Sequence, residues 1–282
     1  MTVSAAPTAR RIEFDYGDDF DADWHPRLPE FAAVANAVSL QMPAVEPFVA
    51  LAVRARLDEL DGAGEEPALA DAAAGYCAQE LEHHAQHRRL NQHLIAATPA
   101  LARVEAWLAS AMGRLEAHRS GDLGVAFAVA FEAMAYAGAR WVDARLRRLL
   151  DGADPLAATL FVWHLAEEVE HKSVADDVAR ALGVRRRDRL LGGVLAFLVL
   201  SVFTVLGLVP QLWRTRRLWH PVALARLVGW AVSFAFELLP ALVLSVFEAQ
   251  RPADLADPAW MERWLTSHDP STRTLPLWNE LA

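Results

Sequence analysis

The chain has 282 residues, a net charge of −9 and a single cysteine, Cys77. It is long enough to bury a large core, as one domain or as one domain with an appendage. The negative charge argues against a nucleic-acid-binding surface, and we expect no nucleic-acid partner. One cysteine excludes an internal disulfide and suits a reducing compartment. The first twenty residues carry charge but no apolar signal-peptide core, so we expect a cytoplasmic protein.

Alanine and leucine dominate the chain, and apolar runs with a period of two are scarce, which favours an all-α protein. Residues 1–28 are predicted to form an irregular arm. Residues 29–185 are predicted to form a bundle of long helices with short connections, because prolines and glycines divide this part into long helical segments. The expected helices span residues 30–41, 44–60, 67–98, 101–118, 123–150 and 155–183.

The composition changes after residue 185. Residues 190–213 contain no charged side chain, and a segment of this length is sufficient to cross a bilayer. The apolar stretch 219–248 is interrupted by Arg226, Glu237 and Pro240 and makes a poor span by itself. We therefore expect 186–282 to form an apolar helical hairpin and tail that packs on the bundle, forms a homodimer interface or associates with the inner membrane, with burial favoured over a true span.

Two segments of the predicted bundle combine glutamate and histidine at helical spacing. Glu80 and His83 lie one turn apart, and Glu168 and His171 repeat the same Glu-x-x-His pattern. Positions three apart share a face of a helix, so each pair is able to bind one metal ion. Taken alone, such a pair is usually a solvated surface feature.

Two further glutamates fit the remaining positions of a dinuclear site. Glu46 precedes Glu80 by 34 residues, and Glu132 precedes Glu168 by 36 residues. In known helical sites, one Glu from each of two helices joins a Glu-x-x-His from each of two others. The alternatives are that Glu46 complements a helix dipole and that Glu132 pairs with Arg140. The repeated spacing favours a ferritin-like bundle with two metal ions and a pseudo-twofold axis.

Four other side chains lie on or near the predicted metal-facing surfaces. His87 and His164 are either additional ligands or groups that orient the ligands through hydrogen bonds. Glu167 lies at the edge of the same face, and His84 is expected at the surface or behind the ligands.

The segments QELEHHAQHRRLN (79–91) and WHLAEEVEHKSVADDV (163–178), with FEAMA around Glu132 and PAVEPF around Glu46, resemble the bacterial family described as predicted metal-dependent hydrolases. The resemblance covers about residues 25–185 and extends loosely into the apolar tail. Members of that family more often have Pro-x-Gly-Glu where this chain has Pro43-Ala44-Val45-Glu46. The spacing is also similar to that of ferritin-like di-iron oxidases and oxygenases, including N-oxygenases with an extra histidine ligand.

Carboxylates with imidazoles suit two iron ions, or manganese in their place. The sequence thus predicts a di-iron oxidase or oxygenase that uses dioxygen, an electron donor of unspecified class and a small lipophilic substrate. The apolar surroundings of Glu132 and the apolar helices after residue 190 motivate the choice of a lipophilic substrate. The alternatives are a two-metal hydrolase, as the family description suggests, and a non-catalytic metal-binding protein.

Overall fold

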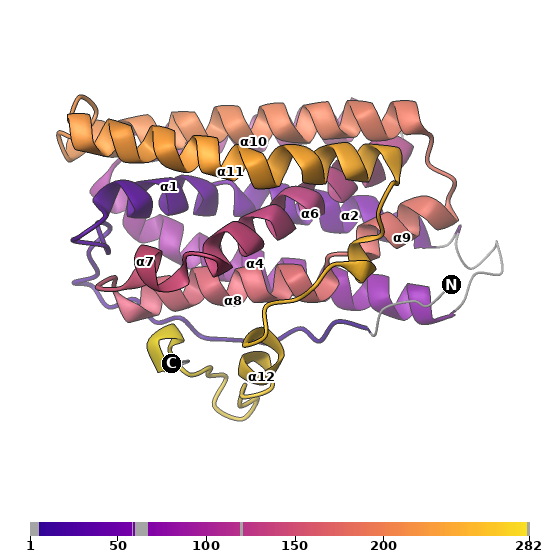
Figure 1. Cartoon of the computed structure of the whole chain (residues 1–282), viewed down its shortest axis with the longest axis horizontal. Coiled ribbons are helices and arrows are strands. Elements are labelled where there is room, and N and C mark those ends of the chain that lie inside the picture. The colour runs from indigo at the N-terminus through magenta and orange to yellow at the C-terminus, as the bar shows by residue number, and fades with distance from the viewer. Residues whose placement is uncertain (1–5, 58, 60–66, 119–120, 281–282) are drawn as a thin grey trace.

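A computed structural model describes residues 6–57, 59, 67–118 and 121–280 (Figure 1). Within these residues the regular structure is helical, and the single β-bridge, between Asp269 and Thr274, lies outside any strand. The predicted all-α bundle with an apolar helical hairpin is confirmed. The α-helices are α1 (Pro29–Ser39), α2 (Met42–Arg54), α4 (Pro67–Ala97), α5 (Leu101–His118), α6 (Gly121–Asp143), α7 (Leu146–Leu150), α8 (Pro155–His171), α9 (Val174–Ala181), α10 (Arg186–Arg214), α11 (Pro221–Phe247) and α12 (Met261–Leu265).

Proline residues set several helix starts. Pro155 occupies the first turn of α8, and the carboxylate of Asp154 caps that helix by accepting a hydrogen bond from the Ala157 N–H at 2.8 Å. Proline at this position loses no helical hydrogen bond, because the first N–H groups of a helix have no partner within it. α11 begins in the same way, with Pro221 after His220.

Two predicted helices are each divided in the structure. The expected helix 123–150 breaks between α6 and α7, where Arg145 has φ −133° and ψ 10°, outside the helical region. The expected helix 155–183 divides into α8 and α9 at Lys172 and Ser173. At this second break the ammonium group of Lys172 donates to the Leu255 carbonyl and pairs with Asp257, which ties the turn to the C-terminal segment.

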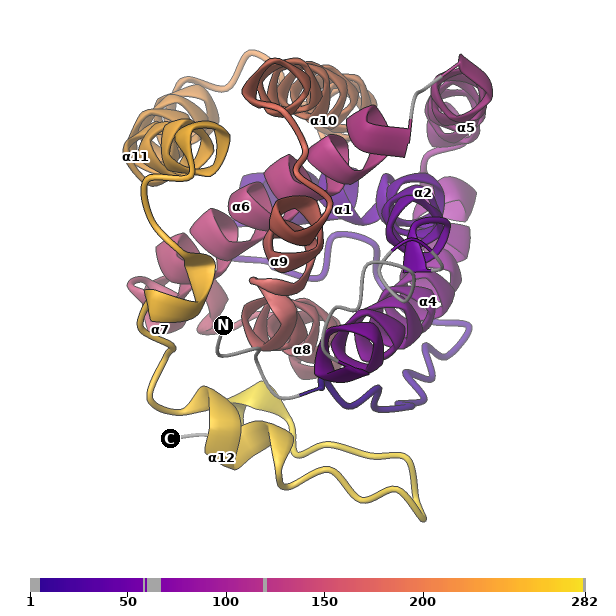
Figure 2. The ribbon, with the colours of Figure 1, turned by 90° about the vertical axis from the view of Figure 1, so that its right-hand side faces the viewer.

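Four helices, α2, α4, α6 and α8, surround the centre of the bundle. Viewed along the bundle, they enclose a common interior, and α2 packs on α4 and α6 while α8 packs on α4 and α6 (Figure 2). The long hairpin of α10 and α11 covers the outer side of α6 (Figures 1 and 2). The predicted division of the chain near residues 28 and 185 stays a prediction.

The described part of the N-terminal arm, residues 6–28, is irregular and runs along the outside of the bundle (Figure 1). It nevertheless buries large side chains, including Phe14 and Trp24. The ring of Phe14 lies 5.6 Å from that of Trp163 on α8. The arm therefore contributes to the core rather than trailing from it.

α10 approaches its neighbours closely at glycine positions. A Cβ atom on Gly192 would lie 2.6 Å from the backbone carbon of Ala126 in α6, and one on Gly207 would lie 3.0 Å from the Cβ of Ala37 in α1. The first distance is shorter than a Cβ atom tolerates without a shift of the backbone, and the second is tighter than most Cβ contacts. These glycines let α10 lie directly against the bundle.

Three described helices, α6, α10 and α11, are long and apolar enough to cross a membrane, and α1 with α2 would count as a fourth span broken by a 41° bend. Their surroundings differ. In the most apolar window of α6, 67% of the residues are buried inside the protein, against 22% for α10 and 6% for α11. The apolar surface of α6 thus serves the core, whereas much of the hairpin's surface faces outward.

Candidate metal centre

The interior enclosed by α2, α4, α6 and α8 contains two adjacent groups of buried carboxylates and imidazoles. In each group the candidate ligand atoms lie within 4.8 Å of one another. The first group is Glu46, His83, His164 and Glu168, and the second is Glu80, Glu132, Glu168 and His171.

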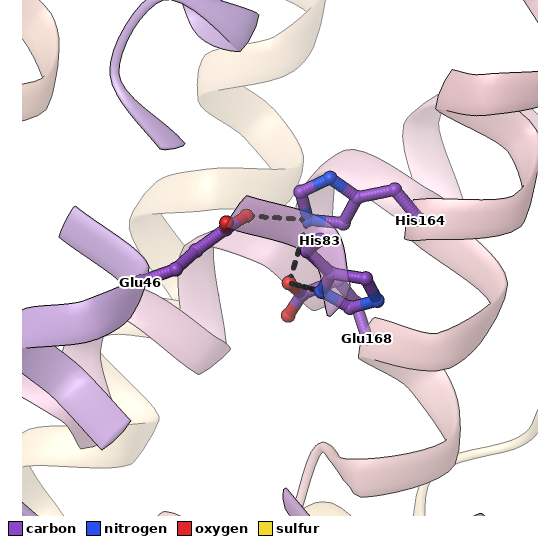
Figure 3. Close-up of side chains that lie close together, drawn as sticks. All are labelled: Glu46, His83, His164 and Glu168. Carbon is purple, nitrogen blue, oxygen red and sulfur yellow. Dashed lines mark hydrogen bonds and ion pairs between the residues drawn. The ribbon is translucent and has the colours of Figure 1, made fainter. Parts of the chain in front are cut away.

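The first group is formed by α2, α4 and α8 (Figure 3). His164 Nε2 lies 2.7 Å from Glu168 Oε1 and 3.5 Å from Glu46 Oε1. His83 Nδ1 lies 3.8 Å from the same oxygen of Glu168. These atoms converge on one point from three helices, as ligands of one ion must.

The second group lies one helical turn further along α8. His171 Nε2 is 3.3 Å from Glu80 Oε1, 3.3 Å from Glu132 Oε2 and 3.2 Å from Glu168 Oε2. Glu168 therefore directs Oε1 to the first group and Oε2 to the second. A carboxylate in this position is able to bridge two ions.

The donor atoms fit divalent cations. Among the described residues, both carboxylate oxygens of Glu46 and of Glu80 are buried without a hydrogen-bond partner, as are Glu132 Oε2 and His83 Nδ1. Burying unpartnered carboxylates costs several kcal/mol each in the absence of a compensating charge. Two cations supply that charge, and oxygen-rich donors with a few imidazoles suit iron or manganese.

The electrostatics of the cluster follow from burial. Burial raises the pKa values of Glu46 and Glu80 well above the usual range, and the carboxylate of Glu168 adds to the effect. Burial would also raise the pKa of Glu168, but His171 and His164 outweigh it and hold that pKa well below its usual range. Burial would lower the pKa of His171, but the carboxylates of Glu132 and Glu168 outweigh it and raise that pKa to about 10. Without cations, burial thus favours the protonated forms of Glu46 and Glu80.

Each ligand histidine is held by a hydrogen bond at its other ring nitrogen. His83 Nε2 lies 3.1 Å from Glu167 Oε2, and His171 Nδ1 lies 2.8 Å from Gln79 Oε1. Such contacts fix the orientation and tautomer of an imidazole so that its free nitrogen points at a metal. The arrangement assigns Nδ1 of His83 and Nε2 of His171 to the centre.

His164 begins a longer hydrogen-bonded chain. Its Nδ1 lies 2.6 Å from His87 Nε2, and His87 Nδ1 lies 2.8 Å from Ser39 Oγ. The Ser39 hydroxyl donates to Asn91 Oδ1 at 2.8 Å. If His164 Nε2 faces the centre, its Nδ1–H donates to His87, whose Nδ1–H then donates to Ser39. Every donor in the chain then has an acceptor.

The four side chains expected near the ligands take different places. His164 belongs to the first group, whereas His87 and Glu167 contact ligand histidines without joining either group. His84 faces the Pro43 carbonyl at 3.2 Å, away from the centre. In addition, Glu80 and His83 fall in different groups, so the α4 motif does not supply one ion as expected. The relative positions of α4 and α8 send these two side chains to opposite ends of the cluster.

Sequence reasoning did not identify three side chains that support the centre. Tyr76 donates from its hydroxyl to Glu132 Oε1 at 2.8 Å, and Gln79 holds His171. Arg10, in the arm, donates to Glu167 Oε1 at 3.0 Å and to both oxygens of Glu170. Tyr76 lies one turn before Glu80 on the same helical face, which is a usable signal. No local pattern marks Arg10, which is 157 residues from its partner.

Comparison with known proteins agrees with this geometry. A family model described as "Predicted metal-dependent hydrolase" matches residues 8–253, which include Arg10, both ligand groups and the apolar hairpin. No curated protein and no solved structure gives a significant match. The match covers most of the chain and extends beyond residues 25–185, the range expected from the motifs. This chain therefore belongs to the family of predicted metal-dependent hydrolases.

Proposed function

We propose that the chain is a two-metal enzyme whose ions are bound by Glu46, Glu80, His83, Glu132, His164, Glu168 and His171. The observation that carries the proposal is the position of Glu168, whose two oxygens face two separate buried ligand groups. A site for a single structural ion would not need a second group of unpartnered carboxylates beside it.

We propose hydrolysis as the reaction class, in keeping with the family description. Two bound metal ions about 3.5–4 Å apart activate water and stabilise negative charge on the oxygen of a carbonyl or phosphoryl group. The protein's own residues hold the ligands in place. Glu167 and Gln79 orient two imidazoles, Tyr76 orients Glu132, and the surrounding helices exclude bulk water from ligand side chains that are almost fully buried.

A second candidate is a di-iron oxidase or oxygenase that uses dioxygen, an external electron donor and a small lipophilic substrate. The specific observation in its favour is the ligand pattern. Glu46 on α2 and Glu132 on α6 join Glu-x-x-His motifs on α4 and α8, which is the pattern of ferritin-like di-iron and di-manganese carboxylate proteins. His164 adds a third imidazole to that pattern.

One set of assays separates the candidates. The purified protein is loaded anaerobically with Fe²⁺ or Mn²⁺, and turnover of ester and phosphoester panels is compared with dioxygen consumption after a chemical reductant is added. Metal-dependent ester or phosphoester cleavage that Glu168→Ala abolishes supports hydrolysis. Rapid dioxygen consumption by the Fe²⁺ form, without cleavage, overturns hydrolysis in favour of the oxidase. Two bound metals with neither reaction indicate a non-catalytic metal-binding protein.

We further propose that the protein acts on the cytoplasmic side of the membrane and associates with it through the apolar hairpin. The support for this association is the outward apolar surface of α10 and α11.

A further inference from the structure

The outward faces of α10 and α11 form two continuous apolar stripes. Exposed residues on α10 recur every three or four positions, which places them on one side of the helix, and the same holds for α11. Each helix is about 40 Å long by its rise per residue, and the two lie side by side across the top of Figure 1. The stripes include Leu191, Leu198 and Val205 on α10 and Val228, Phe236 and Val243 on α11.

Ion pairs tie the hairpin to the bundle near both of its ends. Arg217 and Arg226 both pair with the buried carboxylate of Glu30, at 3.3 Å and 2.6 Å, near the turn of the hairpin. Arg189, near the other end, pairs with Asp176 at 2.6 Å. Removing a partner from such a buried pair is costly, so the hairpin does not leave the bundle readily.

This attachment argues against a transmembrane orientation. If the hairpin crossed a bilayer, the bundle beside it would enter the hydrocarbon as well (Figure 1). α4 would then carry exposed arginines, Arg88 and Arg89, into lipid. Charged side chains at that depth in a bilayer are strongly unfavourable. A hairpin that lies parallel to the membrane surface keeps these charges in water while its apolar stripes contact lipid.

The charge of the chain is distributed unevenly. Residues 185–251 contain nine arginines and three acidic residues, a net charge of +6 within a chain whose total is −9. Seven of these arginines pair with carboxylates, several of them on the bundle. Exposed arginines stand at both ends of the hairpin. Arg186 at one end and Arg216 at the other have no carboxylate partner within the described residues. Trp213 and Trp219 are exposed and lie three residues before and after Arg216 in the sequence. Tryptophan favours the interface between lipid and water, so these side chains suit a membrane surface.

A basic groove runs along the flank of α11. It has a volume of about 680 Å³ between α11 and the region of α7, and Arg145, Arg148 and Arg226 line it together with Val222 and Trp230. The exposed Arg148 has no ion-pair partner among the described residues. Val222 also belongs to the exposed apolar surface of α11. Arg226 already pairs with Glu30 and Arg145 contacts Trp141, so the groove offers the guanidinium group of Arg148 beside an apolar surface.

We propose that the α10–α11 face lies flat on an anionic lipid bilayer, with its apolar stripes in the acyl boundary and its arginines on lipid phosphates. Such in-plane helices combine buried apolar area with attraction to anionic headgroups. A second copy of the chain fits less well. Each end of the hairpin carries an exposed arginine without a carboxylate partner among the described residues, Arg186 or Arg216, so a parallel or an antiparallel pairing would bring arginine near arginine.

The first test uses vesicle flotation with the full chain and is independent of the metal centre. We expect binding to vesicles of phosphatidylcholine with phosphatidylglycerol, several-fold weaker binding to phosphatidylcholine alone, and loss of the difference in high salt. Leu198→Asp should weaken binding about tenfold or more, since it replaces an apolar side chain that would contact lipid by a charge. Leu81→Asp on α4 is the matched control, because the two leucines are 50% and 52% exposed. Equal loss in both variants, or no binding by the unaltered chain, overturns the proposal.

The second test measures depth. In a Cys77→Ala background, a single cysteine is introduced at position 191, 202 or 213 and carries a fluorescent label. Quenchers attached to the lipids at known depths then measure how deep each label lies in the bilayer. Flat docking predicts equal and shallow depths at the three positions, whereas a span predicts that position 202 is deepest. A deepest middle position contradicts the proposal. So does a dimer in lipid-free solution that Leu198→Asp dissociates, because it assigns the face to a second copy.

Discussion

The metal centre and the α10–α11 hairpin reverse the usual distribution of side chains in opposite ways. The centre buries four carboxylates at or near zero exposure, and the hairpin exposes long rows of valine, leucine and phenylalanine. Buried charges need partners, and large exposed apolar surfaces usually mark an interaction. Each region is thus incomplete without something from outside the chain: cations for the first and an apolar surface for the second. The two regions meet at α6, which carries Glu132 on one side and supports the hairpin on the other.

The largest effect is expected at the carboxylate that joins the two ligand groups. Glu168→Ala removes a ligand from both, so bound metal should fall from two ions per chain to less than one. Elemental analysis after metal loading and desalting measures the change. Glu82→Ala is the control, because Glu82 pairs with the exposed Arg11 and belongs to neither group. Retention of two ions by Glu168→Ala would rule out its bridging position.

Metal affinity should rise with pH. Burial raises the pKa values of Glu46 and Glu80, so without metal these groups hold protons at pH values where free carboxyl groups do not. Metal must displace those protons, and its apparent Kd, measured by competition with a chelator, should fall as pH rises from 5.5 to 7.5.

The stability of the metal-free chain should follow the opposite course. A raised folded-state pKa means that the folded form binds more protons than the unfolded form. The free energy of unfolding therefore decreases as pH rises above about 4.5, the ordinary glutamate value, until the folded-state pKa is reached. Thermal melts of metal-free and metal-loaded protein between pH 5 and pH 8 test this, and the gap in Tm should widen with pH. A gap that narrows over this range would contradict the assignment of these carboxylates as ligands.

Substitution of two adjacent arginines of the arm allows the contribution of a buried ion pair to stability to be compared with that of an exposed one. Arg10→Ala leaves Glu167 buried without its cation and should lower the free energy of unfolding by about 3 kcal/mol. Arg11→Ala removes an arginine whose side chain is 73% exposed and should cost less than about 1 kcal/mol. Denaturant unfolding of both variants provides the comparison. Equal values would mean that the arm does not support the centre.

A smaller effect than that of Arg10→Ala is expected where α10 meets α6. Gly192→Ala places a Cβ against the backbone of α6 and should destabilise the protein by about 1–3 kcal/mol. Gly229→Ala on α11 is the control, since its Cβ would meet no atom within 4 Å and alanine favours a helix. Destabilisation by Gly229→Ala and not by Gly192→Ala would contradict the close packing of the hairpin on the bundle.

The candidate ligands could be proposed from the sequence because they depend on local periodicity. Glu80, His83, Glu168 and His171 follow helical spacing within single helices, and Glu132 stands out as a carboxylate in an apolar helix. The features that escaped prediction depend on how distant segments meet. Arg10 reaches the centre only through the path of the arm, and the assignment of Glu80 and His83 to different groups depends on the alignment of α4 with α8. The break at Arg145 likewise depends on one backbone conformation with no proline or glycine to announce it.

The central claim is that one buried carboxylate joins two metal ions, and metal stoichiometry tests it most directly. The full chain is loaded anaerobically with Fe²⁺, desalted and analysed for iron and for protein, in parallel with Glu168→Ala and Glu82→Ala. We expect two irons per chain for the unaltered protein and for Glu82→Ala, and less than one for Glu168→Ala. One iron or none in the unaltered protein, with Mn²⁺ giving the same value, would contradict it.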